Sequence, residues 1–313
     1  MTTKVKPVGL ALSGEHVAAL LADRRLTARL NASGLPFAVA GIDRVDSAAA
    51  RSIVGSAHHA TEPAVAVATL ADWAPDLGWL AVAAAHRDRP DTLADSVAWA
   101  SQRAGGRLGL VLGLRDRSAP AGDSLPTSPQ AARDAAAAIR AQWHRRVPGT
   151  ESPQTAPEAP VLAWRAESTG EAAAAGSVAD ILVWPAQRPE PLTTVTAASS
   201  GRPRLFLEIP AGGSNLGSRL AGHLAEQHTA GVILRPGRGE MALRDFVANA
   251  WPALARSGAF RTGWSGTLRE RLALPATKPV TAADSTALPD RAPEPALGGR
   301  VPAQAALPAG GRR

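Results

Sequence analysis

The chain has 313 residues, of which 45% are hydrophobic and 19% charged, and 34 Lys+Arg against 27 Asp+Glu give it a net charge of +7. This balance is typical of a globular protein, and it is too apolar for a chain that is disordered throughout. The absence of Cys excludes disulfides, thiolate metal sites and cysteine nucleophiles, and the scattered arginines form no stripe with aromatic residues of the kind that binds nucleic acid.

Short apolar runs alternate with Ala-rich segments of helical pattern along most of the chain. The runs read as strands that are buried on both faces, because they are continuously apolar rather than strictly alternating. In chain order the predicted strands are Val8–Ser13, Phe37–Ile42, Leu77–Ala85, Leu108–Leu114, Val161–Trp164, Ile181–Trp184, Leu205–Ile209 and Val232–Leu234. Alternation of strand and helix favours a parallel sheet.

Helical segments follow most of these strands. The predicted helices are Glu15–Leu30, Glu62–Trp73, Asp91–Arg103, Ala131–Arg145, Gly170–Ala179, Leu216–Thr229 and Met241–Arg256, and any helix within 185–202 is short. Eight strand–helix units fit an α/β (β/α)8 TIM barrel, and a doubly wound open sheet is the alternative.

The two ends of the chain differ from its middle. The N-terminus lacks a sufficient apolar segment for a signal peptide, and no run of about 18 apolar residues indicates a membrane span, so we expect a cytoplasmic protein. From about Pro275 the sequence is rich in Ala, Pro, Thr and Gly. We therefore predict a barrel over residues 1–274 and a disordered tail over 275–313.

Chemistry in such a barrel is expected where strands end, at the C-terminal mouth. Residues there that could act are Ser13, His16, Asp43, His58, His59, His86, Arg115, Arg165, Ser168, Arg188 and Arg235. The adjacent His58 and His59 are a poor metal pair because their side chains diverge, so we predict no metal site. Ser168 could simply cap a helix, or it could mark a place where backbone amides hold a phosphate. Dinucleotide, Walker, nucleophile-elbow and zincin motifs are absent.

Several stretches resemble the luciferase-like flavin monooxygenases. The segments Glu62–Asp72, Leu77–Ala85, Pro90–Ala94 and Gly105–Gly109 resemble the family's helix–strand–helix–strand block. Phe260–Leu274, with its Phe-Arg-Thr-Gly-Trp-Ser-Gly-Thr-Leu-Arg, is similar to the C-terminal signature of the branch of nitrilotriacetate, pristinamycin and dibenzothiophene-sulfone monooxygenases. Pro160–Asp180 resembles its phosphate-binding segment.

The resemblance implies a (β/α)8 barrel that uses reduced FMN from a separate flavin reductase, together with O2, on a small organic substrate. It also implies that such barrels can form homo- or heterodimers. By position it assigns Asp43 and Ala84 to the flavin site, and Ser168 and Gly170 to its phosphate, with Arg165 as a further phosphate contact. His86, His58 and His59 are then the candidate catalytic groups.

The chain departs from the family pattern at positions that normally contact flavin or oxygen. The family has a polar residue at the position of Ala84 and an Asn at that of Val111. It has a Tyr-His pair where this chain has Asp91 and Thr92. Two interpretations follow: a divergent monooxygenase, or a degenerate, non-catalytic barrel that acts as a binding or partner subunit. A deazaflavin (F420) oxidoreductase is a third, disfavoured because the C-terminal signature belongs to the FMN branch.

Overall fold

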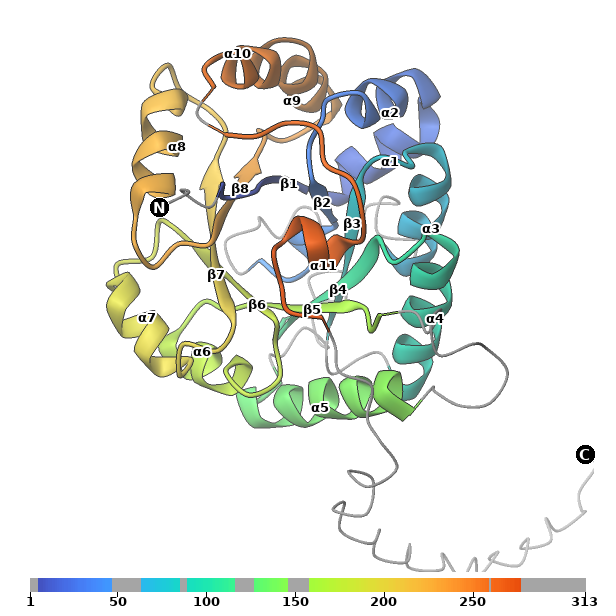
Figure 1. Ribbon diagram of the computed structural model, residues 1–313, viewed down its shortest axis with the longest axis vertical. Coiled ribbons are helices and arrows are strands. Elements are labelled where there is room, and N and C mark those ends of the chain that lie inside the picture. The colour runs from blue at the N-terminus through green and yellow to red at the C-terminus, as the bar shows by residue number, and fades with distance from the viewer. Residues whose placement is uncertain are drawn as a thin grey trace, which may run out of the picture. The chain divides into compact units, whose positions relative to one another are not determined.

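A computed structural model describes residues 5–46, 63–84, 89–115, 127–145, 158–258 and 260–276 of the chain. Residues up to Pro279 belong to one compact unit, and in its described ranges eight parallel strands close into a barrel in sequence order (Figure 1). The strands are β1 (Val8–Leu12), β2 (Phe37–Ala40), β3 (Gly78–Ala84), β4 (Leu108–Gly113), β5 (Val161–Arg165), β6 (Ile181–Pro185), β7 (Arg204–Pro210) and β8 (Gly231–Arg235). The TIM barrel prediction is confirmed.

Helices surround the ring of strands, except the last one, α11, which lies across its centre, as Figure 1 shows. They are α1 (Gly14–Ala22), α2 (Arg24–Asn31), α3 (Pro63–Trp73), α4 (Pro90–Arg103), α5 (Pro129–Arg145), α6 (Thr169–Ala175), α7 (Leu192–Ala198), α8 (Leu216–Ala225), α9 (Glu240–Asp245), α10 (Trp251–Arg256) and α11 (Leu268–Arg271). Among the described residues, none of the helices has the length and apolar character needed to cross a bilayer.

Two predicted helices are divided in the structure. The expected helix Glu15–Leu30 is α1 followed by α2, because Asp23 adopts an extended conformation and its carboxylate accepts the N–H groups of Arg25 and Leu26 as the cap of α2. The expected helix Met241–Arg256 contains a π-helical turn, η4 (Phe246–Ala250), just before Pro252. Proline has no N–H for the α-helical bond, which accounts for a local change in winding there.

The barrel interior is filled by side chains and is not a channel. Phe37 and Phe206 meet edge to face near its N-terminal end, with ring centroids 5.9 Å apart. Their rings occupy space that the neighbouring strands leave open at glycines: a Cβ on Gly9 would lie 2.3 Å from Phe37, and one on Gly231 would lie 2.3 Å from Phe206. The two aromatic rings therefore depend on glycine at these two positions.

The N-terminal end of the barrel is covered by α11, a helix that the strand–helix pattern did not predict. Figure 1 shows α11 across the centre of the ring, and Leu268 and Leu272 join the apolar cluster of the barrel interior. Thr267 caps α11, and Arg271 donates to the carbonyl oxygens of Pro36 and Asp76, which precede β2 and β3. The segment that resembles the family's C-terminal signature thus closes the end opposite the mouth.

Candidate functional site

A buried ion-pair network lies at the C-terminal mouth of the barrel. Arg165 at the end of β5 donates from Nε to Oε2 of Glu208 on β7 at 2.8 Å, and from Nη2 to Oδ1 of Asp46 at 3.2 Å. Its Nη1 donates to Glu167 two residues further on. Asp46 follows the short 3-10 turn η1 (Ile42–Arg44) that comes after β2. One guanidinium therefore joins three segments that are far apart in sequence.

Arg235 and Arg188 extend this network toward solvent. Arg235, at the end of β8, donates from Nη1 to Asp46 and, at 3.0 Å, to Oε1 of Glu208. Arg188 donates to Oε2 of Glu167 at 2.8 Å. The Arg165 side chain is 2% exposed, whereas those of Arg235 and Arg188 are 29% and 35% exposed. Three arginines thus face three carboxylates, and the outer two reach the surface of the mouth.

The environment of Arg165 explains how a guanidinium can lie so deep in the barrel. Burial alone would lower its pKa, but the carboxylates of Glu208, Asp46 and Glu167 offset this and raise it above the ordinary arginine value. A buried charge is tolerated when it is paired and hydrogen-bonded. Because the guanidinium already contacts three carboxylates, we assign it to holding the mouth together rather than to an open anion site.

Sequence reasoning did not include Asp46 and Glu208 among the site residues. Glu208 carried a usable signal, because it interrupts the apolar run of β7 at a position that points to the same side as Phe206. A charged residue on the inner face of a barrel strand requires a partner. Asp46 carried no such signal, since an acid after a turn is ordinary in any loop.

Asp43 lies in η1 and is 2% exposed. Its Oδ1 accepts the backbone N–H of Gly14, the first residue of α1, at 2.9 Å. A carboxylate at this place stabilises the start of α1, whose first N–H groups have no partner within the helix. The acid that the resemblance assigns to the flavin site therefore also ties η1 to α1.

His16 is buried beside this turn. The N–H of Ser13 donates to its Nδ1 at 3.2 Å, and Nε2 lies 3.1 Å from the carbonyl oxygen of Gly239 before α9. The two bonds fit a neutral imidazole with its proton on Nε2. Burial lowers the pKa of His16, and the hydrogen bond to Gly239 and the Asp43 carboxylate act in the opposite direction. His16 thus serves as part of the α1 capping box.

Ser168 caps α6, directly after β5. Its Oγ accepts the N–H of Glu171 at 3.3 Å and donates to Oε1 of Glu171 at 3.2 Å, while Oε2 of Glu171 accepts the N–H of Glu167 at 3.0 Å. The capping role considered from the sequence is confirmed. Burial raises the pKa of Glu171, and the nearby Glu167 carboxylate adds to this.

Small residues line the inner face of the mouth on two adjacent strands. Ala84 at the end of β3 pairs in register with Gly113 on β4. A Cβ on Gly113 would lie 2.5 Å from Cβ of Val45, the residue that follows η1. Val45 thus packs into the space over Gly113 and belongs to the barrel's inner apolar cluster. The turn after β2 consequently covers part of the barrel end.

The candidate catalytic residues His58, His59 and His86 lie outside the described residues. Their roles stay predictions. Within the described part of the chain, no three His, Asp or Glu side chains gather in a way that could hold a metal ion.

Comparison with known proteins finds similarity in solved structures. No protein-family model matches the chain. No curated protein matches it either. The EDTA monooxygenase EmoA from Chelativorans sp. BNC1 superposes with a TM-score of 0.66 at 14% identity, over 87% of this chain and 99% of that one.

Two further structures are similar over most of the barrel. Riboflavin lyase RcaE, solved with modified FMN and riboflavin, gives a TM-score of 0.59 at 14% identity, over 90% of this chain and 98% of that one. DmoA from Hyphomicrobium sulfonivorans gives a TM-score of 0.60 at 12% identity, over 86% of this chain and 92% of that one. The chain therefore shares the barrel fold of these three proteins.

Proposed function

We propose that this chain is a divergent luciferase-like monooxygenase of the cytoplasm. It would take reduced FMN from a separate flavin reductase and use it with O2 on a small organic substrate. The observation that carries the proposal is that Asp43 and the Ser168–Gly170 segment both follow strands at the same, C-terminal end of a barrel with this fold. The resemblance assigns both to the flavin, and enzymes with this architecture act at that end.

The residues at the start of α6 fit a phosphate group in part. Backbone N–H groups in the first turn of a helix have no partner within it, which applies to those of Thr169 and Gly170. Space above Gly170 is open, since a Cβ there would meet nothing nearer than Oγ of Ser168 at 4.0 Å. Arg165 does not add to this fit, because its donors are directed at carboxylates.

Reduced FMN would supply the electrons that activate O2, and the chain's own residues would bind and orient it. The α6 amides and the Ser168 hydroxyl would hold the phosphate. Asp43, fixed by Gly14, would border the ring system. The Arg165 network would keep η1 and Val45 over the barrel end, which would help to exclude water from the mouth. His86, His58 and His59 remain the proposed acid–base groups.

A second candidate function is a non-catalytic barrel that acts as a binding or partner subunit. One observation favours it: the carboxylate of Glu171 already takes the Ser168 hydroxyl and the Glu167 amide at the start of α6. A flavin phosphate placed there would meet this carboxylate at short range, and like charges repel. The two candidates therefore differ in whether the chain binds reduced flavin.

Anaerobic titration of the full chain with oxidised and photoreduced FMN, followed by flavin fluorescence, separates the two candidates. We expect micromolar binding of reduced FMN and much weaker binding of F420. Failure of FMN to bind in either oxidation state would overturn the monooxygenase and leave the partner subunit. Tighter binding of F420 than of FMN would assign the chain to the deazaflavin enzymes instead.

Substitutions at α6 test where the phosphate binds. Ser168→Ala should weaken reduced-FMN binding about tenfold through the loss of one hydrogen bond to a charged group. Glu171→Gln keeps the capping geometry and removes the competing charge, so it should tighten binding. Glu226→Gln removes a charge at the other end of the barrel and is the control. Unchanged affinity in both α6 variants would remove the assignment.

Asp43→Asn tests the second assigned residue, because asparagine keeps an oxygen that can accept the Gly14 N–H. We expect an unchanged melting temperature together with altered flavin affinity or turnover. If all three are unchanged, Asp43 serves only to fix the start of α1.

A further inference from the structure

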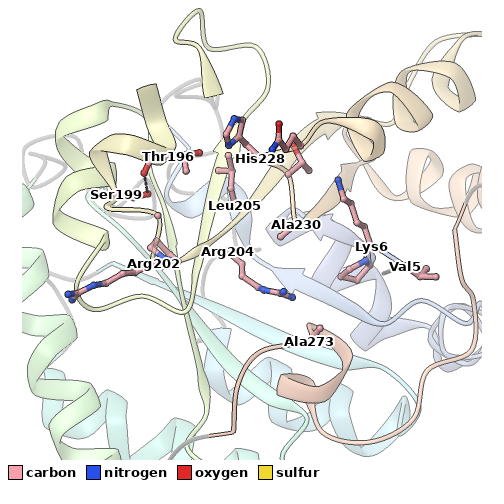
Figure 2. Close-up of a pocket in the computed structure, with 15 residues that line it drawn as sticks. Val5, Lys6, Thr196, Ser199, Arg202, Arg204, Leu205, His228, Ala230 and Ala273 are labelled. Atoms are coloured by element: carbon pink, nitrogen blue, oxygen red, sulfur yellow. Dashed lines mark hydrogen bonds between the residues drawn. The ribbon is translucent and has the colours of Figure 1, made fainter. Parts of the chain in front are cut away.

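A cavity of about 410 Å³ lies at the N-terminal end of the barrel, opposite the candidate active site. Figure 2 shows its wall, which comes from the residues before β1, the end of α7 and the turn after it, the start of β7 and the residues just before β8.

The lining of this cavity is positively charged. Lys6, Arg202 and Arg204 contribute three cationic groups, His228 contributes an imidazole, and none of the lining residues, all of which are described, is acidic. Figure 2 shows the Lys6 and Arg204 side chains coming from different elements, whereas Arg202 extends to the other side of the view, away from both. Such a lining attracts anions.

Lys6 and Arg204 each make one hydrogen bond to a backbone carbonyl and have further N–H donors for a ligand. Nζ of Lys6 donates to the carbonyl oxygen of Glu226 at 2.7 Å, and Nη1 of Arg204 donates to that of Leu272 at 2.9 Å. An ammonium has three N–H donors and a guanidinium five. Burial lowers the pKa of Lys6, against the effect of the Glu226 carboxylate. A bound anion would offset this desolvation of the ammonium group.

We propose that this cavity binds a small phosphorylated molecule. The phosphate oxygens would accept from Lys6 and Arg204, and the phosphate charge would be balanced by the cationic lining. The volume exceeds what a lone phosphate needs and lies in the range of small-molecule sites, so it leaves room for an organic part of the ligand.

Isothermal titration of the full chain with inorganic pyrophosphate at low ionic strength tests the proposal. Lys6→Gln removes one cationic donor, and it should weaken pyrophosphate binding about tenfold with little change in the melting temperature. Arg204→Gln removes the second donor and should weaken pyrophosphate binding by a similar factor.

Two controls make the outcome specific. Arg29→Gln removes one positive charge from the exposed side of α2, so it corrects for net charge, and it should leave the affinity unchanged. Ser168→Ala should leave the Lys6-dependent binding unchanged, which separates this cavity from the proposed flavin site. The proposal is overturned by an absence of binding, by equal affinity in all variants, or by an affinity that responds to Ser168→Ala but not to Lys6→Gln.

Discussion

Arg165 shows how one side chain can fix the geometry of the barrel mouth. It pairs with Asp46, Glu167 and Glu208, and its side chain is 2% exposed. The value of such a network lies less in net stability than in specificity, because desolvation offsets much of the attraction between buried charges. Removing one member, however, leaves its partners buried and unpaired.

We therefore expect Arg165→Met to lower the free energy of unfolding by about 3–5 kcal/mol near neutral pH. Acidification should reduce the loss, because carboxylates left without the guanidinium can take up protons. Urea denaturation at two pH values measures both effects. Arg103→Met, which breaks an exposed pair with Asp72, is the control and should cost no more than about 1 kcal/mol. Equal costs at the two sites would contradict the role of Arg165.

His16 gives a second prediction at the scale of single residues. His16→Ala loses the bonds to Ser13 and Gly239 and should cost roughly 1–3 kcal/mol at pH 7.5. Since burial lowers the pKa of His16, its contribution is present above the unfolded-state pKa of about 6.5 and is lost as the pH falls through the folded-state pKa.

The difference between wild type and His16→Ala should consequently shrink as the pH is lowered from 7.5 to 5, as measured by urea midpoints. His223→Ala, on the outer helix α8, is the comparison. A difference that grows on acidification would show that the folded protein prefers the charged imidazole.

Between neighbouring strands, a large side chain on one strand fills the space that a glycine leaves on the next. Phe37 occupies the space beside Gly9, and Phe206 occupies the space beside Gly231. Gly9→Ala would bring a Cβ to 2.3 Å from the Phe37 ring, in a barrel closed on all sides. The Phe37 ring is fully buried, and β1 is paired with a strand on either side, so both are held in place.

We expect Gly9→Ala to destabilise the protein by about 1–3 kcal/mol or more, through overpacking. Gly222→Ala is the matched control, because nothing lies within 4 Å of a Cβ at this position in α8. It should stabilise by about 0.5–1 kcal/mol, since alanine is the better helix former. Thermal unfolding of both variants distinguishes local packing from a general sensitivity to glycine replacement.

At the scale of the whole molecule, the compact unit that holds the barrel extends to Pro279. The closing helix α11 and the Arg269 side chain, which donates to the carbonyl oxygen of Pro275, belong to this unit. We predict that a chain ending at Pro279 unfolds at the same temperature as the full chain, in agreement with the tail composition. A clear fall in the melting temperature on truncation would contradict the predicted boundary.

Much of the architecture was accessible from local sequence. Most strands are continuous apolar runs, and strand–helix alternation predicts parallel pairing, so the barrel followed from counting these units. The division of the helix Glu15–Leu30 at Asp23 was not predicted, although its cause is local, because the cap bonds of Asp23 reach only two and three residues ahead. Helix α11 was missed as a closing element, since its four residues carry no period that could be recognised.

The sequence by itself determined the strand order and the polar residues that end the strands, because these depend on hydrophobic pattern and neighbouring positions. Only the tertiary structure decided the partners of those residues. Arg165 meets Asp46 across 119 positions and Glu208 across 43, because barrel closure brings the C-terminal ends of β2, β5 and β7 to the same mouth. Closure likewise places Lys6 beside the starts of β7 and β8, where the cavity at the opposite end forms. Such contacts have no local signal, since their energy depends on burial that exists only when the ring is complete.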